Sequence, residues 1–273
     1  MSPACYHPLM RRAGLLLFFF LCASPAVDAA DKLDPLSEAR QLYNQRQFDA
    51  ALTAAERARL TPAAADRADL IAARAYLERF RESAASDDLT KARERLRRID
   101  PKRFDPLERT EFIVGLGEAL YFDESYGAAA DVFETVLETG SALPADSRER
   151  VLDWWAIAVD RDAWLRPEPW RDSAYQRIRA RMRDELTTRP GSSTAAYWLA
   201  AAARSQGDLQ AAWDAAEAGW VRASLALDRG AALRADLDRL MLVAIIPERA
   251  KTLAQSADTL RVEWEKFKER WGN

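Results

Sequence analysis

The chain has very few histidines and cysteines, and all of them lie near its N-terminal end. Its single histidine, His7, and its two cysteines, Cys5 and Cys22, fall within the first 22 residues. Everything after them lacks a thiol or an imidazole. This excludes the usual soft metal ligands, the commonest general base and a disulfide framework. We therefore expect no metal ion, no cofactor and no enzymatic activity.

Glycine and net charge are also in short supply. The ten glycines include no Gly-rich phosphate loop. With 40 basic and 43 acidic residues, the formal net charge of -3 is too balanced to indicate nucleic acid or an anionic membrane as a partner. No alternation of apolar and polar residues is long enough to predict a β-strand.

The first residues resemble an export signal. Two arginines and an apolar run at residues 13–22 are followed by small residues. This pattern predicts a signal peptide over residues 1–29, cleaved between Ala29 and Ala30. The apolar run of about ten residues is too short to cross a bilayer, so we expect no transmembrane anchor.

The compartment follows from this leader. Lipid attachment at Cys22 is disfavoured because Leu21 stands where lipid-attachment signals carry Gly, Ala or Ser. We therefore expect an exported protein, periplasmic or secreted, held together by its core rather than by disulfides.

What the chain does have is helical periodicity throughout. One apolar stripe comprises Val151, Trp154, Trp155, Ala158 and Val159, and another comprises Leu233, Leu237, Leu240, Met241 and Ala244. Proline-containing breakers divide the chain into about twelve segments of helical length. A last stripe of Leu260, Trp264, Phe267 and Trp271 predicts a C-terminal helix that caps the fold.

One stretch carries a recognisable repeat pattern. It has Leu116 and Gly117 in a first helix, Tyr126 at the turn, and Ala129 and Phe133 in a second helix. This pattern resembles the tetratricopeptide repeat family. The resemblance implies a right-handed α-solenoid of stacked helix-turn-helix pairs, in which small residues let paired helices approach closely.

The resemblance extends in degenerate form over most of the chain. We expect a single helical repeat domain over 30–273, with repeats at 34–61, 64–102, 106–142, 145–190 and 192–225 and C-terminal helices at 228–272. Positions equivalent to Ala129 are 41, 37, 49 and 34 residues apart, so helices or loops must be longer in places, notably around residues 165–169. The competing interpretation is an irregular helical bundle.

The resemblance also implies where a partner would bind, because solenoid repeats expose a concave surface lined by their first helices. Family ligand contacts flank the small packing residue of the first helix. Carried onto this sequence, those positions are Arg40, Tyr43, Glu118, Tyr121, Tyr197 and Arg204. Guanidinium and phenol groups suit an extended peptide. The alternative is that these are ordinary solvated residues.

Tryptophan is confined to the second half of the chain, from Trp154 to Trp271. Trp164 and Trp170 flank a proline-rich segment that we expect to be a loop. Two indoles there could stack on a sugar or on a proline-rich peptide. The favoured interpretation is that they fold back and cover a gap in the core.

These observations favour a non-enzymatic scaffold or adaptor of the bacterial cell envelope that holds a protein or an extended peptide. An alternative is a protein that binds or cleaves envelope glycan through carboxylates and the Trp-rich half. Glu124-Ser125 matches the start of the lytic transglycosylase signature, but the Gly-rich stretch ending in Met-Gln is missing. A third possibility is a helical domain that assists assembly of a larger complex through its outer surface.

Overall fold

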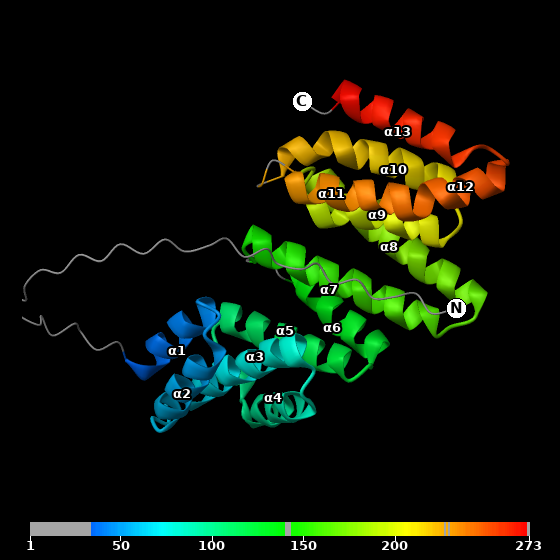
Figure 1. The fold of residues 1–273 in the computed structure, drawn as a ribbon. Coiled ribbons are helices and arrows are strands. Elements are labelled where there is room, and N and C mark those ends of the chain that lie inside the picture. The colour runs from blue at the N-terminus through cyan, green and yellow to red at the C-terminus, as the bar shows by residue number, and fades with distance from the viewer. Residues whose placement is uncertain (1–33, 140–142, 227, 229, 272–273) are drawn as a thin grey trace, which may run out of the picture. The chain divides into compact units, whose positions relative to one another are not determined.

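The computed structural model describes residues 34–139, 143–226, 228 and 230–271, and the predicted leader lies outside them. All regular structure in these ranges is helical and none is a strand, which confirms the all-helical prediction (Figure 1). The α-helices are α1 (Pro35–Asn44), α2 (Phe48–Arg59), α3 (Ala65–Ser83), α4 (Ser86–Arg98), α5 (Pro106–Phe122), α6 (Tyr126–Thr139), α7 (Ala145–Trp164), α8 (Glu168–Thr188), α9 (Ser193–Ser205), α10 (Leu209–Arg222), α11 (Ala231–Leu240), α12 (Ile246–Leu253) and α13 (Ala257–Trp271).

Short irregular helices complete the described chain. Two are 3-10 turns, η1 (Pro101–Arg103) and η2 (Ala223–Leu225), and one is a π-helical segment, η3 (Met241–Ile245), between α11 and α12. Proline has no N–H and its ring crowds the carbonyl four residues earlier. Widening the helix before Pro247, with the Ile246 N–H bonded to Met241 O, relieves this crowding. Counting α11, η3 and α12 as one continuous helix, the described ranges hold the expected twelve.

Aspartate followed by proline starts two of the α-helices. Asp34 accepts hydrogen bonds from backbone N–H groups of the first turn of α1. Asp105 and Glu108 form a reciprocal capping box at the start of α5. Proline at the first helical position costs no hydrogen bond, because that N–H has no partner within the helix. The Asp-Pro pairs that interrupt the helical pattern of the sequence therefore mark where the next helix begins.

Successive helices pack against each other in chain order, from α1 on α2 to α12 on α13. Each odd-numbered helix also contacts the next odd-numbered one, from α1 with α3 to α9 with α11. We call α1, α3, α5, α7, α9 and α11 the first-helix row. Their even-numbered partners connect consecutive members of this row.

The same turn joins three of the helix pairs. Arg46, Glu124 and Gly207 each have a positive φ, of 60°, 60° and 76°. In each turn the residue with positive φ donates its N–H to the carbonyl three residues earlier, and the next residue donates to the carbonyl five residues before it. This is the Schellman arrangement. It places Tyr43, Tyr121 and Arg204 at equivalent positions of their helices.

The closest helix approach lies between α5 and α6. A Cβ added to Gly117 would lie 2.6 Å from Phe133 Cε1, and Phe133 itself is fully buried. Only glycine allows the ring to sit on the backbone of α5. Ala129 is also fully buried on α6. The small residues of the repeat pattern therefore lie at the close contact.

The core falls into three apolar clusters along the chain. One joins α1, α2 and α3, a second joins α3, α4 and α5, and a third runs from α6 to α13. Trp264 and Phe267 of α13 belong to the third cluster, and their rings stack at 5.6 Å between centroids. Trp271, the last residue of the predicted capping stripe, is 51% exposed.

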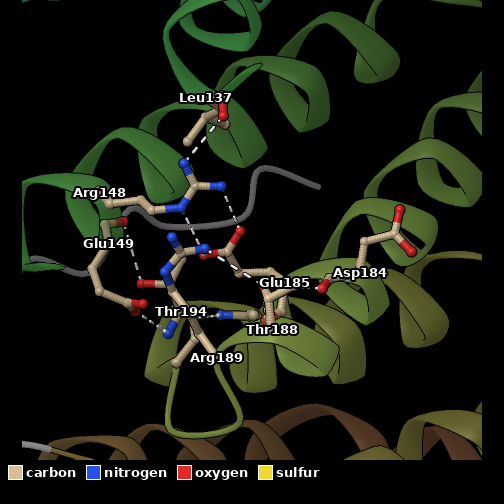
Figure 2. Close-up of polar contacts among 10 residues, drawn as sticks. Leu137, Arg148, Glu149, Asp184, Glu185, Thr188, Arg189 and Thr194 are labelled. Atoms are coloured by element: carbon tan, nitrogen blue, oxygen red, sulfur yellow. Dashed lines mark hydrogen bonds and ion pairs between the residues drawn. The ribbon is translucent and has the colours of Figure 1, made fainter. Parts of the chain in front are cut away.

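Buried carboxylates bind arginines on neighbouring helices. The Arg148 guanidinium of α7 donates two hydrogen bonds of 2.8 Å to Glu185 of α8 and a third, of 3.1 Å, to Leu137 O of α6 (Figure 2). Burial raises the pKa of Glu185, but the hydrogen bonds from Arg148 and the charges of Arg148 and Arg189 lower it further, so the net shift is downward. Asp69, Asp88 and Glu108 are buried in the same way and pair with arginines.

Candidate interaction surface

The six predicted contact residues lie on the first-helix row, and their surroundings differ. Arg40 of α1 faces the buried Glu108, with its guanidinium 3.6 Å from the carboxylate. Arg67 of α3 donates to the same carboxylate at 2.6 Å. Arg40 is therefore engaged in holding α1 to α5, with about half of its side chain still exposed.

Tyr43 and Glu118 line one hollow of about 160 Å³. We call it the Glu118 hollow. Its walls come from four members of the first-helix row, α1, α3, α5 and α7. The polar lining is Tyr43, Arg74, Glu78, Thr110, Glu111, Glu118, Arg81, Ser147 and Arg150, and the apolar lining is Leu107, Val114, Leu143, Pro144, Val151 and Trp154. The hollow thus combines cations, carboxylates and aromatic rings from several helix pairs.

Most charges in this hollow pair with each other. Arg74 lies 3.2 Å from Glu111 and stacks over the Tyr43 ring at 4.7 Å from its centroid. Arg81 forms an ion pair with Glu78. Glu118 is half-buried and, within the described chain, has neither a hydrogen bond nor an ion pair. Burial raises the pKa of Glu118 to about 7, which Arg74, Arg81 and Arg150 only partly counteract and Glu78 reinforces.

Tyr121 takes part in an aromatic cluster beside this hollow. Its ring lies 4.9 Å from Trp154 and 5.2 Å from Tyr126, both edge to face. Burial raises the pKa of its hydroxyl, and the charge and hydrogen bond of Arg161 act against this. The cluster fixes Trp154, which is also a wall of the Glu118 hollow.

Arg204 and Trp164 line a second, wider hollow of about 500 Å³, which we call the Trp164 hollow. Arg204 forms a forked ion pair with Glu248 of α12, with Nε at 3.0 and 3.1 Å from the two carboxylate oxygens. Gln206 donates to Asp172 Oδ1 at 2.6 Å. The remaining lining is Glu168, Arg171, Tyr175, Ser205 and Gly207.

A partly buried hydrogen bond holds Tyr175, one of the residues that line the Trp164 hollow. Tyr175 donates to Asp160 Oδ1 at 3.0 Å. Burial raises the pKa of Asp160, although the hydrogen bond from Tyr175 lowers it. Burial and the neighbouring Asp160 raise the pKa of Tyr175 to about 12.

Tyr197 lies on α9, near the start of the helix. Its ring meets Trp198 edge to face at 5.9 Å, and the Trp198 indole donates to Asp153 of α7 at 2.7 Å. Burial raises the pKa of both Tyr197 and Asp153. Tyr197 does not line either hollow.

The indoles around residues 164–170 bear on two expectations. Trp164 is the last residue of α7 and Trp170 lies in the first turn of α8, so only residues 165–167 separate the helices. Pro167 and Pro169 occupy the N-cap and the first turn, where proline is tolerated. Trp164 and Trp170 are 61% and 69% exposed. The extra length of this repeat therefore lies in α7 and α8 rather than in a loop, and the expectation that the indoles cover the core is wrong.

Several surface residues were missed from the sequence. Arg74, Trp154 and Glu248 complete the two hollows. Arg74 belongs to a helix in which the repeat pattern was too weak to number first-helix positions. Trp154 belongs to an apolar stripe, which predicted core rather than surface. Glu248 reaches Arg204 only because the chain continues as helix through Pro247.

The described residues contain neither a membrane-spanning helix nor a cluster of metal ligands. No described helix has the length and hydropathy needed to cross a bilayer. Among the same residues, no three carboxylate, thiol or imidazole groups gather as metal ligands would. Comparison with protein-family models, curated proteins and solved structures gives no match for this chain.

Proposed function

We propose that the helix pairs form a tetratricopeptide-like α-solenoid of the bacterial cell envelope, a non-enzymatic scaffold whose first-helix row binds an extended segment of another protein. The observation that carries this proposal is the position of the Glu118 hollow. Its lining comes from four helices of the row and from pairs far apart in the sequence. Side chains spread over several repeats suit a ligand that runs along the row.

The chemistry of the row supports a peptide ligand. Tyr43, Tyr121 and Tyr197 offer rings with one polar atom each, and Arg74 and Arg204 offer guanidinium groups that are already oriented by carboxylates. Rigid aromatic and planar cationic groups lose little entropy when a ligand binds.

Site-specific cross-linking in the source cell tests this function. A photoreactive residue is introduced at Tyr43, Tyr121 or Tyr197, with matched positions at Glu138 of α6 and Gln210 of α10, both exposed on second helices. We expect one partner to be captured from the first-helix positions and not from the matched ones. Capture of the same partner mainly from Glu138 and Gln210 would favour assembly through the outer surface instead.

A second function has one observation in its favour. In the Trp164 hollow, an exposed indole lies with the carboxylates of Glu168, Asp172 and Glu248. Indoles stack on sugar rings, and carboxylates bind sugar hydroxyls. Titration with soluble envelope-glycan fragments distinguishes the two functions. Saturable quenching that disappears in Trp164→Phe would favour glycan binding, and released reducing ends would favour cleavage.

A further inference from the structure

We propose that the Glu118 hollow is a pocket for a basic side chain, lysine or arginine, of the bound segment, with the Glu118 carboxylate as the acceptor. This inference rests on the proposed function and adds the chemistry of one anchor. It follows from which carboxylates in the hollow are already paired with a cation and which one is not.

The charges of the inner walls largely cancel in pairs. Arg74 pairs with Glu111 and Arg81 pairs with Glu78. Arg150, at the exposed rim, contacts Ser147 Oγ at 3.4 Å. Glu118 is then the one lining carboxylate within the described chain that forms neither an ion pair nor a hydrogen bond, although Arg74, Arg81 and Arg150 lie near enough to act on its pKa. A half-buried carboxylate without a partner is costly, and a cation that enters the hollow removes that cost.

The size and lining of the hollow fit one long side chain. A volume of about 160 Å³ corresponds to roughly five water molecules, which excludes a whole helix. Trp154, Val114 and Tyr43 supply apolar surface against which a methylene stem can pack. The rings of Trp154 and Tyr43 also attract a cation that passes over them. Arg150 can move outward because its side chain is exposed.

The affinity of this pocket for a basic side chain should depend on pH. The titratable and charged groups that line the hollow with Glu118 come from four helices: Tyr43 of α1, Arg74, Glu78 and Arg81 of α3, Glu111 of α5, and Arg150 of α7. With a pKa of about 7, Glu118 is largely protonated one unit below this value and largely ionised one unit above it. A basic ligand requires the ionised form. Its affinity should therefore rise about tenfold from about pH 6 to about pH 8, and an acidic ligand should show the opposite trend.

The test begins with a random-peptide phage library selected on the whole chain at about pH 8. Selected peptides are synthesised with their basic residue intact or replaced by norleucine, which keeps the stem and removes the charge. Affinities are measured on the unchanged protein, on Glu118→Gln and on Glu138→Gln. The last is a matched control at an exposed position of α6. A thermal melt verifies that each variant is folded.

We expect the selected peptides to share a lysine or arginine, and norleucine to weaken binding about tenfold or more. Glu118→Gln should weaken the parent peptide equally, abolish its pH dependence and leave the norleucine peptide unaffected. Glu138→Gln should change nothing.

Two results would overturn the inference, and they are distinguishable. Peptides that bind the row without a basic residue, or that bind more tightly as pH falls, refute the Glu118 pocket and leave the scaffold function standing. If no peptide binds and cross-links from Tyr43, Tyr121 and Tyr197 also yield no partner, the proposed function fails along with the pocket.

Discussion

The two halves of the described chain are stabilised differently. From α1 to α5 the core is split into two small clusters, rich in alanine, and three buried carboxylates each pair with an arginine of another helix. From α6 to α13 a single cluster is continuous and contains the buried indoles. In the described residues of this half, Glu185 is the only buried carboxylate.

The difference shows two ways of stacking helix pairs. Alanines allow close approach but bury little area, so ion pairs between helices add directional contacts to the first half. Large rings bury more area and hold the second half with fewer charges. We expect the first half to respond more strongly to salt and pH, since ion pairs with partly exposed arginines are screened.

The largest effect should come from the indole-based half. Trp264 is fully buried, stacks on Phe267 and donates to Asp238 at 2.8 Å. Trp264→Ala should lower the free energy of unfolding by about 3–5 kcal/mol. Trp271→Ala, at a 51% exposed position of the same helix, should cost less than about 1 kcal/mol. Urea denaturation of both variants measures this, and equal losses would contradict the contrast.

Loss of a buried charge should be the next largest effect, in the first half. Asp69 is buried and accepts from Arg95 at 2.7 Å and Arg59 at 3.3 Å. Asp69→Ala leaves both guanidinium groups without this acceptor and should cost about 3 kcal/mol. The control is Asp49→Ala, since Asp49 is exposed and pairs with Arg79. A cost there above about 1 kcal/mol would show that exposed pairs matter as much as buried ones.

The junction between the halves depends on one glycine. Gly117→Ala would push a methyl group into Phe133 and should lower the free energy of unfolding by about 1–3 kcal/mol. Gly115, two residues away, has 3.5 Å to Leu96 Cδ2, an ordinary contact. Gly115→Ala should be neutral or stabilise by up to about 1 kcal/mol because alanine favours helix. Differential scanning calorimetry compares the two, and a tolerated Gly117→Ala would refute the close approach.

Glu118 should make stability depend on pH. Its pKa of about 7 lies above the ordinary 4.5, so the folded state holds the proton more tightly than the unfolded state. The stability gained from this is fully present below 4.5 and is lost as the pH rises through 7. Glu118→Gln should therefore stabilise the protein by on the order of 2 kcal/mol at about pH 8 and by little at about pH 5. Unfolding curves at both pH values check this, and a pH-independent effect would contradict it.

The smallest effect should come from the repeated turn. Glu124 has φ 60°, which costs a residue with a side chain about 1 kcal/mol. Glu124→Gly should stabilise by up to about 1 kcal/mol, and Gly207→Ala, at the equivalent position of another pair, should destabilise by a similar amount. Thermal melts of the two variants should shift in opposite directions. Shifts of the same sign would show that the turns are not equivalent.

The sequence predicted the features that depend on local interactions. The breaker at Asp105 and Pro106 predicted the start of the repeat at 106–142, and in the structure a capping box and a proline in the first turn begin α5 there. The repeat resemblance implied a close helix approach at Gly117, and the structure shows that the Phe133 ring occupies the space that a side chain at this position would need. The placement of Tyr43, Tyr121 and Arg204 on one row followed from the same repeat register.

The sequence failed where distant segments decide the outcome. Trp164 and Trp170 were expected to cover the core, but α7 and α8 are longer than the repeat and carry both indoles into solvent. The apolar stripe of Trp154 predicts a core position, yet this partly buried indole also lines the Glu118 hollow. The residues next to these tryptophans in the sequence do not distinguish a core indole from a surface indole.

The amino-acid order alone thus determined that this chain is helical, where many of its helices begin, and which faces are apolar. Those properties follow from hydrogen bonding and periodicity over a few residues. The packing of helices decided the rest. Glu118 acquires its unusual proton affinity, and Arg74 and Trp154 become its neighbours, only because α1, α3, α5 and α7 line the same small hollow and partly bury the Glu118 carboxylate there.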